Sequence, residues 1–357
     1  MMNLKWKFLF LGLVVSRFAS SQNNQHSFFN YSSFGAQYYY GTSIGHTFKR
    51  IRDSRPYSGE LIFQKQINVS PFWNHTKRLP QWGIGLSATH SGSKYVGTLI
   101  CLYPFIKLPL YTVGPLQGNL RFGFGAGWVE RPYDKITNSE NLLLSQRISS
   151  HANISFQNEV RISPRHFINV TAMFYHMSNA KTSLPNLGIN IPSVSLGYRY
   201  AFNADAKKFS IVNDSLDKKF FKQIFFTTGV KQMQVPDSSY YLVQILSGEI
   251  GKQLSYSSTV SIGMYVTHDE SVKTDPLVKH LGAVKNSQVA VYGSYEYNLG
   301  KLSIPVQFGI FVYNSNSKLL ESVGFRYKIS QHWLAELLLK SHLHRADLMH
   351  LGVGYKF

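Results

Sequence analysis

From residue 27 onward, apolar and polar positions alternate along the chain in segments about ten residues long. Glycine, proline, serine, asparagine or charged clusters separate these segments. Because successive side chains of a β-strand point to opposite faces, this alternation gives each strand one apolar and one polar face. The pattern predicts an all-β fold, the antiparallel strands of a transmembrane β-barrel with an apolar outside and a polar interior.

The C-terminal segment Leu351–Phe357 shows the alternation most clearly, because its odd positions are apolar and its even positions are Gly, Gly and Lys. A terminal phenylalanine on such a strand resembles the C-terminal signature of bacterial outer-membrane proteins. The same signature occurs in mid-chain, over residues 194–202, where it looks like a former C-terminus.

Two pairs of similar segments indicate a duplication. Residues 84–90 match residues 262–268 at four identical positions, at an offset of 268 − 90 = 178. A pair of histidines ten residues apart occurs at 166 and 176 and again at 332 and 342, at an offset of 342 − 176 = 166. We therefore expect two homologous halves.

Each half contains eight expected strands. In the first half they span residues 30–43, 57–68, 82–91, 96–108, 117–129, 150–162, 166–178 and 191–202. In the second half they span residues 222–235, 240–252, 256–268, 286–298, 302–314, 319–329, 332–342 and 348–357. Two 8-stranded barrels and one barrel of about sixteen strands both fit, because eight strands already close a barrel with a filled interior and both counts are even.

The sequence also predicts the division of the chain. Residues 1–21 are expected to be a cleavable secretory signal, because two lysines precede an apolar run and small residues follow it. Residues 22–203 form the first repeat, residues 204–221 a linker that lacks the alternation, and residues 222–357 the second repeat. The single Cys101 excludes an internal disulfide framework.

Composition and charge suit a membrane protein with an anionic partner. Aromatic and charged residues each make up 15% of the chain, and the net charge is +19. An exported chain meets little nucleic acid, whereas phosphorylated lipid headgroups surround an outer-membrane barrel. The basic cluster of Lys49, Arg50, Arg52 and Arg55 either binds lipid phosphate or forms a solvated loop.

The candidate chemistry lies at the end of the seventh expected strand. Its even positions from Ile168 to Phe174 are apolar, whereas Asn169 and Thr171 are polar, so the even face is expected to meet lipid. His176 and Ser178 continue this face. With a periplasmic N-terminus, odd-numbered strands run outward, which places both residues at the outer leaflet of the outer membrane.

A serine hydroxyl, an imidazole and a group that holds the imidazole are the parts of a serine hydrolase. Ser178 would be the nucleophile, His176 the general base and Asn190 the orienting group. Asn179, Asn186 and the backbone around Gly188 would donate hydrogen bonds to a tetrahedral oxyanion. On spacing alone, His176 and Ser178 suit an interfacial polar rim better than a catalytic pair.

The segment from 174 to 202 resembles the PagL-type lipid A 3-O-deacylases, also called acyloxyacyl hydrolases. The resemblance covers residues 28–202 and rests on His176-Met177-Ser178-Asn179, the loop 185–190 and the strand 195–200. It implies an eight-stranded outer-membrane barrel that hydrolyses the acyl ester at the 3-position of lipid A with a Ser-His-Glu triad. It implies no metal and no other cofactor.

One departure from the family pattern is Asn190, where the pattern has a glutamate. Asparagine fixes an imidazole tautomer but does not offset the charge of an imidazolium. Glu159 is the alternative carboxylate, but its parity on the sixth strand points it into the barrel. The competing hypothesis is therefore a non-catalytic barrel, a structural protein or narrow pore, with a decayed site.

The second half is expected to be non-catalytic. His342 takes the place of His176, but His344 and Arg345 replace the serine and asparagine that follow it in the first half. The Pro-Asn-x-Gly-x-Asn loop is also missing. A metal site at His342, His344 and His350 is not expected, because no cysteine or carboxylate cluster accompanies them.

Overall fold

The computed structural model describes residues 31–44, 54–67, 79–203, 219–233, 239–273, 286–313, 318–342 and 345–357. The expected signal at 1–21 and the linker over 204–218 lie outside the described residues, as do Lys49, Arg50, Arg52 and His344. The described residues include no helical segment with the length and hydropathy of a membrane-spanning helix.

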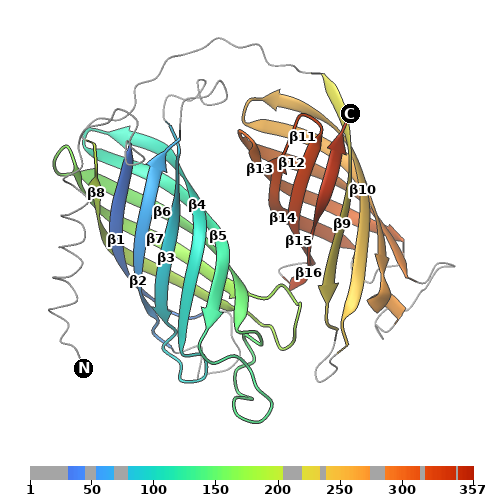
Figure 1. Ribbon diagram of the computed structural model, residues 1–357, viewed down its shortest axis with the longest axis horizontal. Helices are drawn as coiled ribbons and strands as arrows, with labels where there is room; N and C mark the ends of the chain where they lie inside the picture. The colour runs from blue at the N-terminus through green and yellow to red at the C-terminus, as the bar shows by residue number, and fades with distance from the viewer. Residues whose placement is uncertain are drawn as a thin grey trace.

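The first half folds into a closed antiparallel barrel in which each strand pairs with the next and β1 pairs with β8 (Figure 1). Its strands are β1 (Ser32–Gly41), β2 (Tyr57–Gln66), β3 (Gln81–His90), β4 (Thr98–Val113), β5 (Leu116–Val129), β6 (Ile148–Arg161), β7 (His166–Ser178) and β8 (Ile189–Ala201).

The second half forms a separate closed barrel, because β9 pairs with both β10 and β16. Its strands are β9 (Phe220–Lys231), β10 (Tyr241–Ser255), β11 (Ser258–Asp269), β12 (Ser287–Leu299), β13 (Leu302–Tyr313), β14 (Leu319–Lys328), β15 (Trp333–His342) and β16 (Arg345–Lys356). The alternative of two 8-stranded barrels is confirmed, and the single large barrel is excluded.

The observed strands agree with the expected ones to within a few residues, except that β4 continues past Pro109 to Val113. Proline has no N–H to give to the ladder and is usually tolerated in strands only at edges or bulges. Here the register shifts between Pro109 and Tyr111, and the strand then pairs with β5 again up to the turn at Gly114. The bulge allows β4 to continue past the position at which the sequence predicted that the strand would end.

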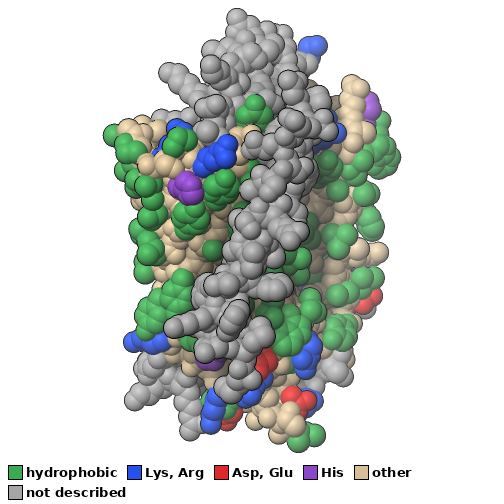
Figure 2. Space-filling view, turned by 60° about the vertical axis from the view of Figure 1, so that its left-hand side comes forward, with side chains coloured by type: hydrophobic (Ala, Val, Ile, Leu, Met, Phe, Trp, Pro, Cys, Tyr) green, Lys and Arg blue, Asp and Glu red, His purple; other side chains and the backbone are tan. Residues whose placement is uncertain are grey.

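The two faces of the strands have opposite character. Apolar side chains point outward, and Figure 2 shows them over the strands, with many of the charged side chains toward the two ends. Inside the first barrel, Arg121 lies 3.1 Å from Glu60. Inside the second, Arg326 lies 2.6 Å from Glu249 and 2.5 Å from Glu336. These buried ion pairs fill both interiors, and the polar-in, apolar-out pattern is that of a transmembrane barrel.

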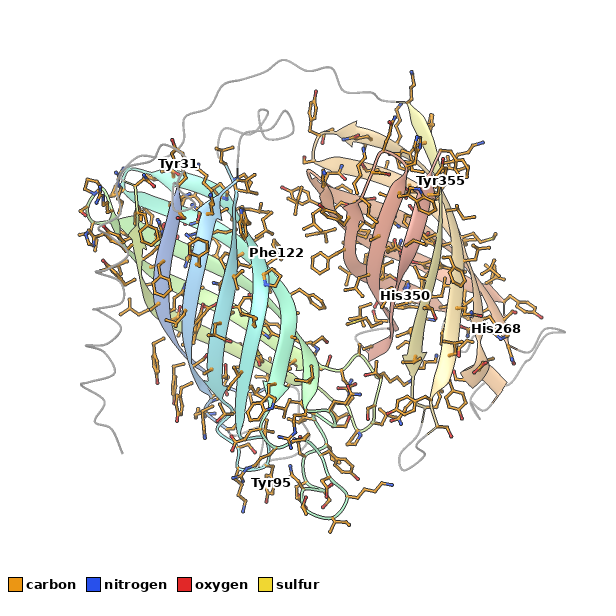
Figure 3. The ribbon with its side chains drawn as sticks, in the orientation of Figure 1. Tyr31, Tyr95, Phe122, His268, His350 and Tyr355 are labelled. Carbon is orange, nitrogen blue, oxygen red and sulfur yellow. The ribbon has the colours of Figure 1, made fainter. Side chains whose placement is uncertain are left out.

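Three connections of the first barrel that the structure describes in full lie at one end of the molecule, called here the loop end: residues 91–97, 130–147 and 179–188. Figure 3 shows Tyr95 at this end, whereas Tyr31 and Tyr355, at the start of β1 and the end of β16, lie at the other. Odd-numbered strands therefore all run toward the loop end, as expected from the sequence.

Candidate active site

Strand β7 carries the candidate site at the loop end. Its even positions from Ile168 to Phe174 are exposed on the outside of the barrel, and Asn169 and Thr171 are buried inside, as predicted. His176 continues the outer face and is half-buried. Ser178 is only 7% exposed, because the strand gives way to the loop 179–188 directly after it.

The imidazole of His176 joins the two other candidate catalytic groups. Its Nε2 lies 2.9 Å from Ser178 Oγ, and its Nδ1 lies 2.7 Å from Asn190 Oδ1. An amide oxygen only accepts, so the proton sits on Nδ1 and Nε2 is left to accept the serine hydroxyl. Both distances fall within the hydrogen-bond reach that a nucleophile and its base require.

Asn190 reaches the histidine because the two residues are direct partners across strands β7 and β8. The Asn190 backbone is held as well, since its carbonyl oxygen accepts a hydrogen bond from Ile44 N at 3.0 Å. Cross-strand neighbours on one face of a sheet have Cβ atoms about 5 Å apart, which suits a side-chain hydrogen bond. The orienting group therefore comes from the sheet and not from a loop.

The remaining predicted residues, Asn179, Asn186 and Gly188, lie in the loop that follows Ser178. Asn179 N donates to Asn186 Oδ1 at 3.0 Å, and Asn179 Nδ2 donates to Ser145 Oγ at 2.9 Å and Ser183 O at 2.8 Å. Gly188 N donates to Leu143 O at 3.0 Å.

The donors of Asn179 and Gly188 are thus used within the protein, and the geometry gives these two residues positioning roles. The Asn186 side chain differs, because its oxygen is engaged and its amide nitrogen meets no acceptor among the described residues. That nitrogen is the candidate donor to an oxyanion.

The backbone conformation and the close packing at position 188 both require a glycine. Its φ is +70°, in the left-handed region that favours glycine. A Cβ there would lie 3.0 Å from His176 Cε1 and 3.3 Å from Ser178 Cβ. The loop backbone therefore packs directly on the histidine and the serine.

The connection 130–147 between β5 and β6 supports the site, and this support was not predicted from the sequence. The carbonyl oxygens of Leu142 and Leu143 accept hydrogen bonds from Leu187 N and Gly188 N. Asn141 holds this segment, because its buried side chain accepts from Leu143 N at 3.1 Å and donates to Arg131 O at 2.6 Å. The apolar run 142–144 inside a long polar connection is the signal that identifies this support.

The second barrel also contacts the loop 179–188, and this contact was not predicted from the sequence either. Gln232, which follows β9, accepts a hydrogen bond from Leu184 N at 2.8 Å through its side chain and donates its own N–H to Lys181 O at 3.1 Å. Lys181 Nζ lies 3.8 Å from a carboxylate oxygen of Asp347 in β16. No sequence signal links these positions, because they come from different repeats.

Glu159 lies in the interior of the first barrel, as its parity predicted. Its carboxylate is 2.5 Å from Arg199 Nη2 and 3.5 Å from Lys107 Nζ, and it is almost fully buried. It is therefore held away from His176, which lies on the outer face.

The corresponding end of the second barrel has a different construction. Strands β15 and β16 are joined by residues 343–344 alone, with His342 paired to Arg345. The first barrel has the ten residues 179–188 at this place. Among the described residues, no three His, Cys, Asp or Glu side chains are grouped so that they could hold a metal ion.

The comparisons with known proteins give a match for each half. Residues 58–199 match the family described as lipid A 3-O-deacylase (PagL), and residues 220–357 match the family described as acyloxyacyl hydrolase, C-terminal domain. None of the curated proteins matches the chain.

Solved structures give weak likenesses. Neisserial surface protein A is 11% identical, with a TM-score of 0.32, and the match covers 48% of this chain and 96% of that one. The siderophore receptor PirA from Pseudomonas aeruginosa is 7% identical, with a TM-score of 0.21, and the match covers 91% of this chain and 80% of that one. Structural similarities with such low identities and TM-scores support no further conclusion about this chain.

Proposed function

Because the chain belongs to the lipid A 3-O-deacylase (PagL) family through residues 58–199, with an acyloxyacyl hydrolase C-terminal domain at 220–357, we propose that it is a serine esterase. It acts in the outer membrane of a Gram-negative cell and removes the acyl chain ester-linked at the 3-position of lipid A. The observation that carries the proposal is the hydrogen bonding of His176 to both Ser178 and Asn190.

In the proposed reaction, Ser178 Oγ attacks the ester carbonyl while His176 Nε2 takes its proton. Asn190 Oδ1 keeps the other imidazole proton on Nδ1. The Asn186 amide nitrogen donates to the oxyanion of the tetrahedral intermediate. The tetrahedral intermediate then collapses, the ester C–O bond breaks, and His176 gives the proton to the leaving sugar oxygen. Water next attacks the acyl group on Ser178 with His176 as the base, and collapse of the second intermediate returns the proton to Ser178 Oγ and releases the fatty acid.

Exposed basic side chains at the loop end could meet an anionic substrate: Lys94, Arg131, Lys135 and Arg147. The connection 130–147 also carries Glu130, Asp134 and Glu140, and Arg131 lies 3.7 Å from Glu130, so its basic side chains are balanced by acidic ones. Lipid A carries its phosphates at the membrane surface, and each basic side chain near an anionic lipid surface contributes about 1 kcal/mol of attraction at most. The acyl chains would then lie below, along the apolar outer face of the strands.

Asn190 favours a second candidate function, a non-catalytic outer-membrane barrel with a decayed site. Without a carboxylate behind it, the imidazolium that forms during the reaction has less stabilisation than in a Ser-His-Glu triad. This candidate predicts that lipid A is the same whether Ser178 is present or not.

The test is to express the protein in a Gram-negative host and to weigh its lipid A by mass spectrometry. We expect the wild type to remove one 3-hydroxyacyl chain and Ser178→Ala to lose this activity by about a thousandfold or more. Ser193→Ala, on β8 of the same barrel and outside the triad, is the matched control and stays active. Unmodified lipid A from a folded wild type would overturn the proposal.

A further inference from the structure

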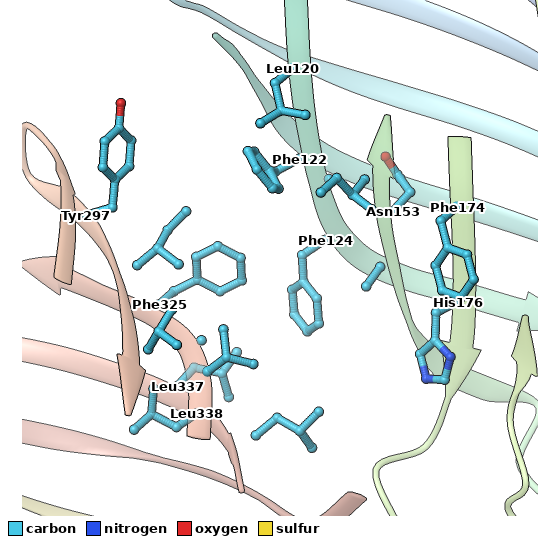
Figure 4. Close-up of a pocket in the computed structure, with 18 of the residues that line it drawn as sticks. Leu120, Phe122, Phe124, Asn153, Phe174, His176, Tyr297, Phe325, Leu337 and Leu338 are labelled. Carbon is cyan, nitrogen blue, oxygen red and sulfur yellow. The ribbon is translucent and has the colours of Figure 1, made fainter. Parts of the chain in front are cut away.

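A deep apolar groove lies between the two barrels and reaches the candidate active site (Figure 4). Its volume is about 820 Å³, and its walls come from β4 to β7 on one side and from β12 to β16 on the other. Pockets for small ligands have volumes of roughly 300–1,000 Å³. Figure 3 shows Phe122 on the side of the first barrel that faces the second.

Contacts between the barrels frame this groove at three levels. At the loop end, Lys181 meets Asp347. In the middle, the rings of Phe124 and Phe325 pack with their centroids 5.4 Å apart. At the opposite end, Leu79 and Leu299 belong to one buried apolar cluster that both barrels build.

The lining of the groove is apolar except near the site. His176 and Phe174 lie at the loop end of the first wall, and Leu108 and Ile304 lie near the opposite end. The groove therefore runs from the imidazole along the strands to the other side of the barrels. This arrangement fits a long hydrocarbon chain whose ester group stays at the histidine.

We infer that the second barrel supplies one wall of an acyl-chain site, and that the chain cleaved from lipid A lies between the barrels with its ester at Ser178. This inference rests on the proposed function. It gives the non-catalytic repeat a direct part in substrate binding, because Phe325, Val323 and Leu337 all face the groove.

A second depression on the first barrel is the alternative place for this chain. It lies on the other side of Phe174, with a volume of about 850 Å³, and Tyr40, Arg55 and Val194 line it. Ser178 lines neither of the two, but His176 lines only the groove between the barrels, and the second depression is the more open. We therefore assign the cleaved chain to the groove between the barrels, which includes the general base.

The test compares three valine-to-tryptophan variants of the full chain. Val323 faces the groove, Val194 faces the second depression and Val266 lies on β11, away from both. All three valines are at least 39% exposed on the outer face, so each substitution adds bulk on the lipid side. The substrates are lipid A species with 3-O-acyl chains of different length and p-nitrophenyl butyrate, a short soluble ester.

Val323→Trp is expected to lower turnover of the longest chain by about tenfold or more relative to the shortest. Its loss on the longest chain exceeds any loss on p-nitrophenyl butyrate, and both activities of Val266→Trp stay unchanged. Equal long-chain activity of Val323→Trp and Val266→Trp, or a loss confined to Val194→Trp, would overturn the groove assignment. A wild type that cleaves nothing would instead overturn the proposed function.

A readout without turnover uses Ser178→Ala and a lipid A analogue with a photoreactive group at the end of its 3-O-acyl chain. Cross-links that excess lipid A suppresses are expected on β14 and β15 of the second barrel as well as on β5 and β6. Competed cross-links on the first barrel alone, around Val194, would contradict the shared site.

Discussion

Lys181 and Asp347 lie 166 positions apart in sequence and pair their charges at 3.8 Å, directly above the groove between the barrels. Asp347 also lies 3.2 Å from Lys231 and 3.0 Å from Lys340, both of the second barrel. The carboxylate thus ties the loop that follows Ser178 to a basic cluster of the other repeat. The second barrel therefore helps to hold the loop 179–188 of the candidate site.

The hydrogen bond from Leu184 N to Gln232 offers a test of this support. Gln232→Ala leaves a backbone N–H of the loop without its acceptor, which costs roughly 1–3 kcal/mol when the group stays buried. We expect faster proteolysis within 179–188 and a lower kcat for lipid A, by about tenfold. Gln244→Ala, on the exposed face of β10, should change neither. Normal kcat and proteolysis in Gln232→Ala would show that the loop holds itself.

The proposed role of Asn190 can be tested by two substitutions, one that removes its side-chain acceptor and one that introduces a carboxylate. Asn190→Ala removes the acceptor at His176 Nδ1, and we expect kcat to fall by about tenfold or more because the imidazole loses its tautomer and orientation. Asn190→Glu restores the carboxylate of the family pattern and should match or exceed the wild-type rate. Turnover of lipid A by mass spectrometry checks both. An inactive but folded Asn190→Glu would mean that another residue holds the histidine.

Gly188 should tolerate no side chain. Gly188→Ala combines a positive φ, which costs about 1–2 kcal/mol for an L-residue, with a methyl group 3.0 Å from His176 Cε1. We expect loss of esterase activity while the barrel still folds, as shown by its heat-dependent mobility in gels.

Gly114→Ala separates these two effects. Gly114 also has a positive φ, +56°, but a Cβ there would meet nothing within 4 Å. This variant carries the backbone strain without the contact, so it should keep its activity. If both variants lose activity equally, the contact at His176 is not the cause.

The strands, and the grouping of the three candidate catalytic residues, follow from the sequence for a physical reason. Alternation of side chains is a local property, so β7 can be assigned together with its outer face. His176 and Ser178 lie on one strand, and Asn190 begins the next one, so hairpin pairing brings them together. The number of barrels could not be predicted in this way. It depends on whether β1 pairs with β8, as Tyr38 and Leu196 do, and no local sequence pattern shows that pairing.

The support of the site could not be predicted in the same way. Leu143, Gln232 and Asp347 reach the loop 179–188 from another connection and from the other barrel. Such contacts depend on how long connections fold and on which faces of the barrels meet. The departure at Asn190 was visible in the sequence, but its bond to His176 needed the structure.

The ion pairs inside both barrels also bear on whether water and solutes can pass through them. Arg121 with Glu60, and Arg326 with Glu249 and Glu336, occupy the space through which a wider barrel would pass water and solutes. In the proposed function, the protein would therefore act on lipid at its outer surface without opening a wide aqueous channel through either barrel.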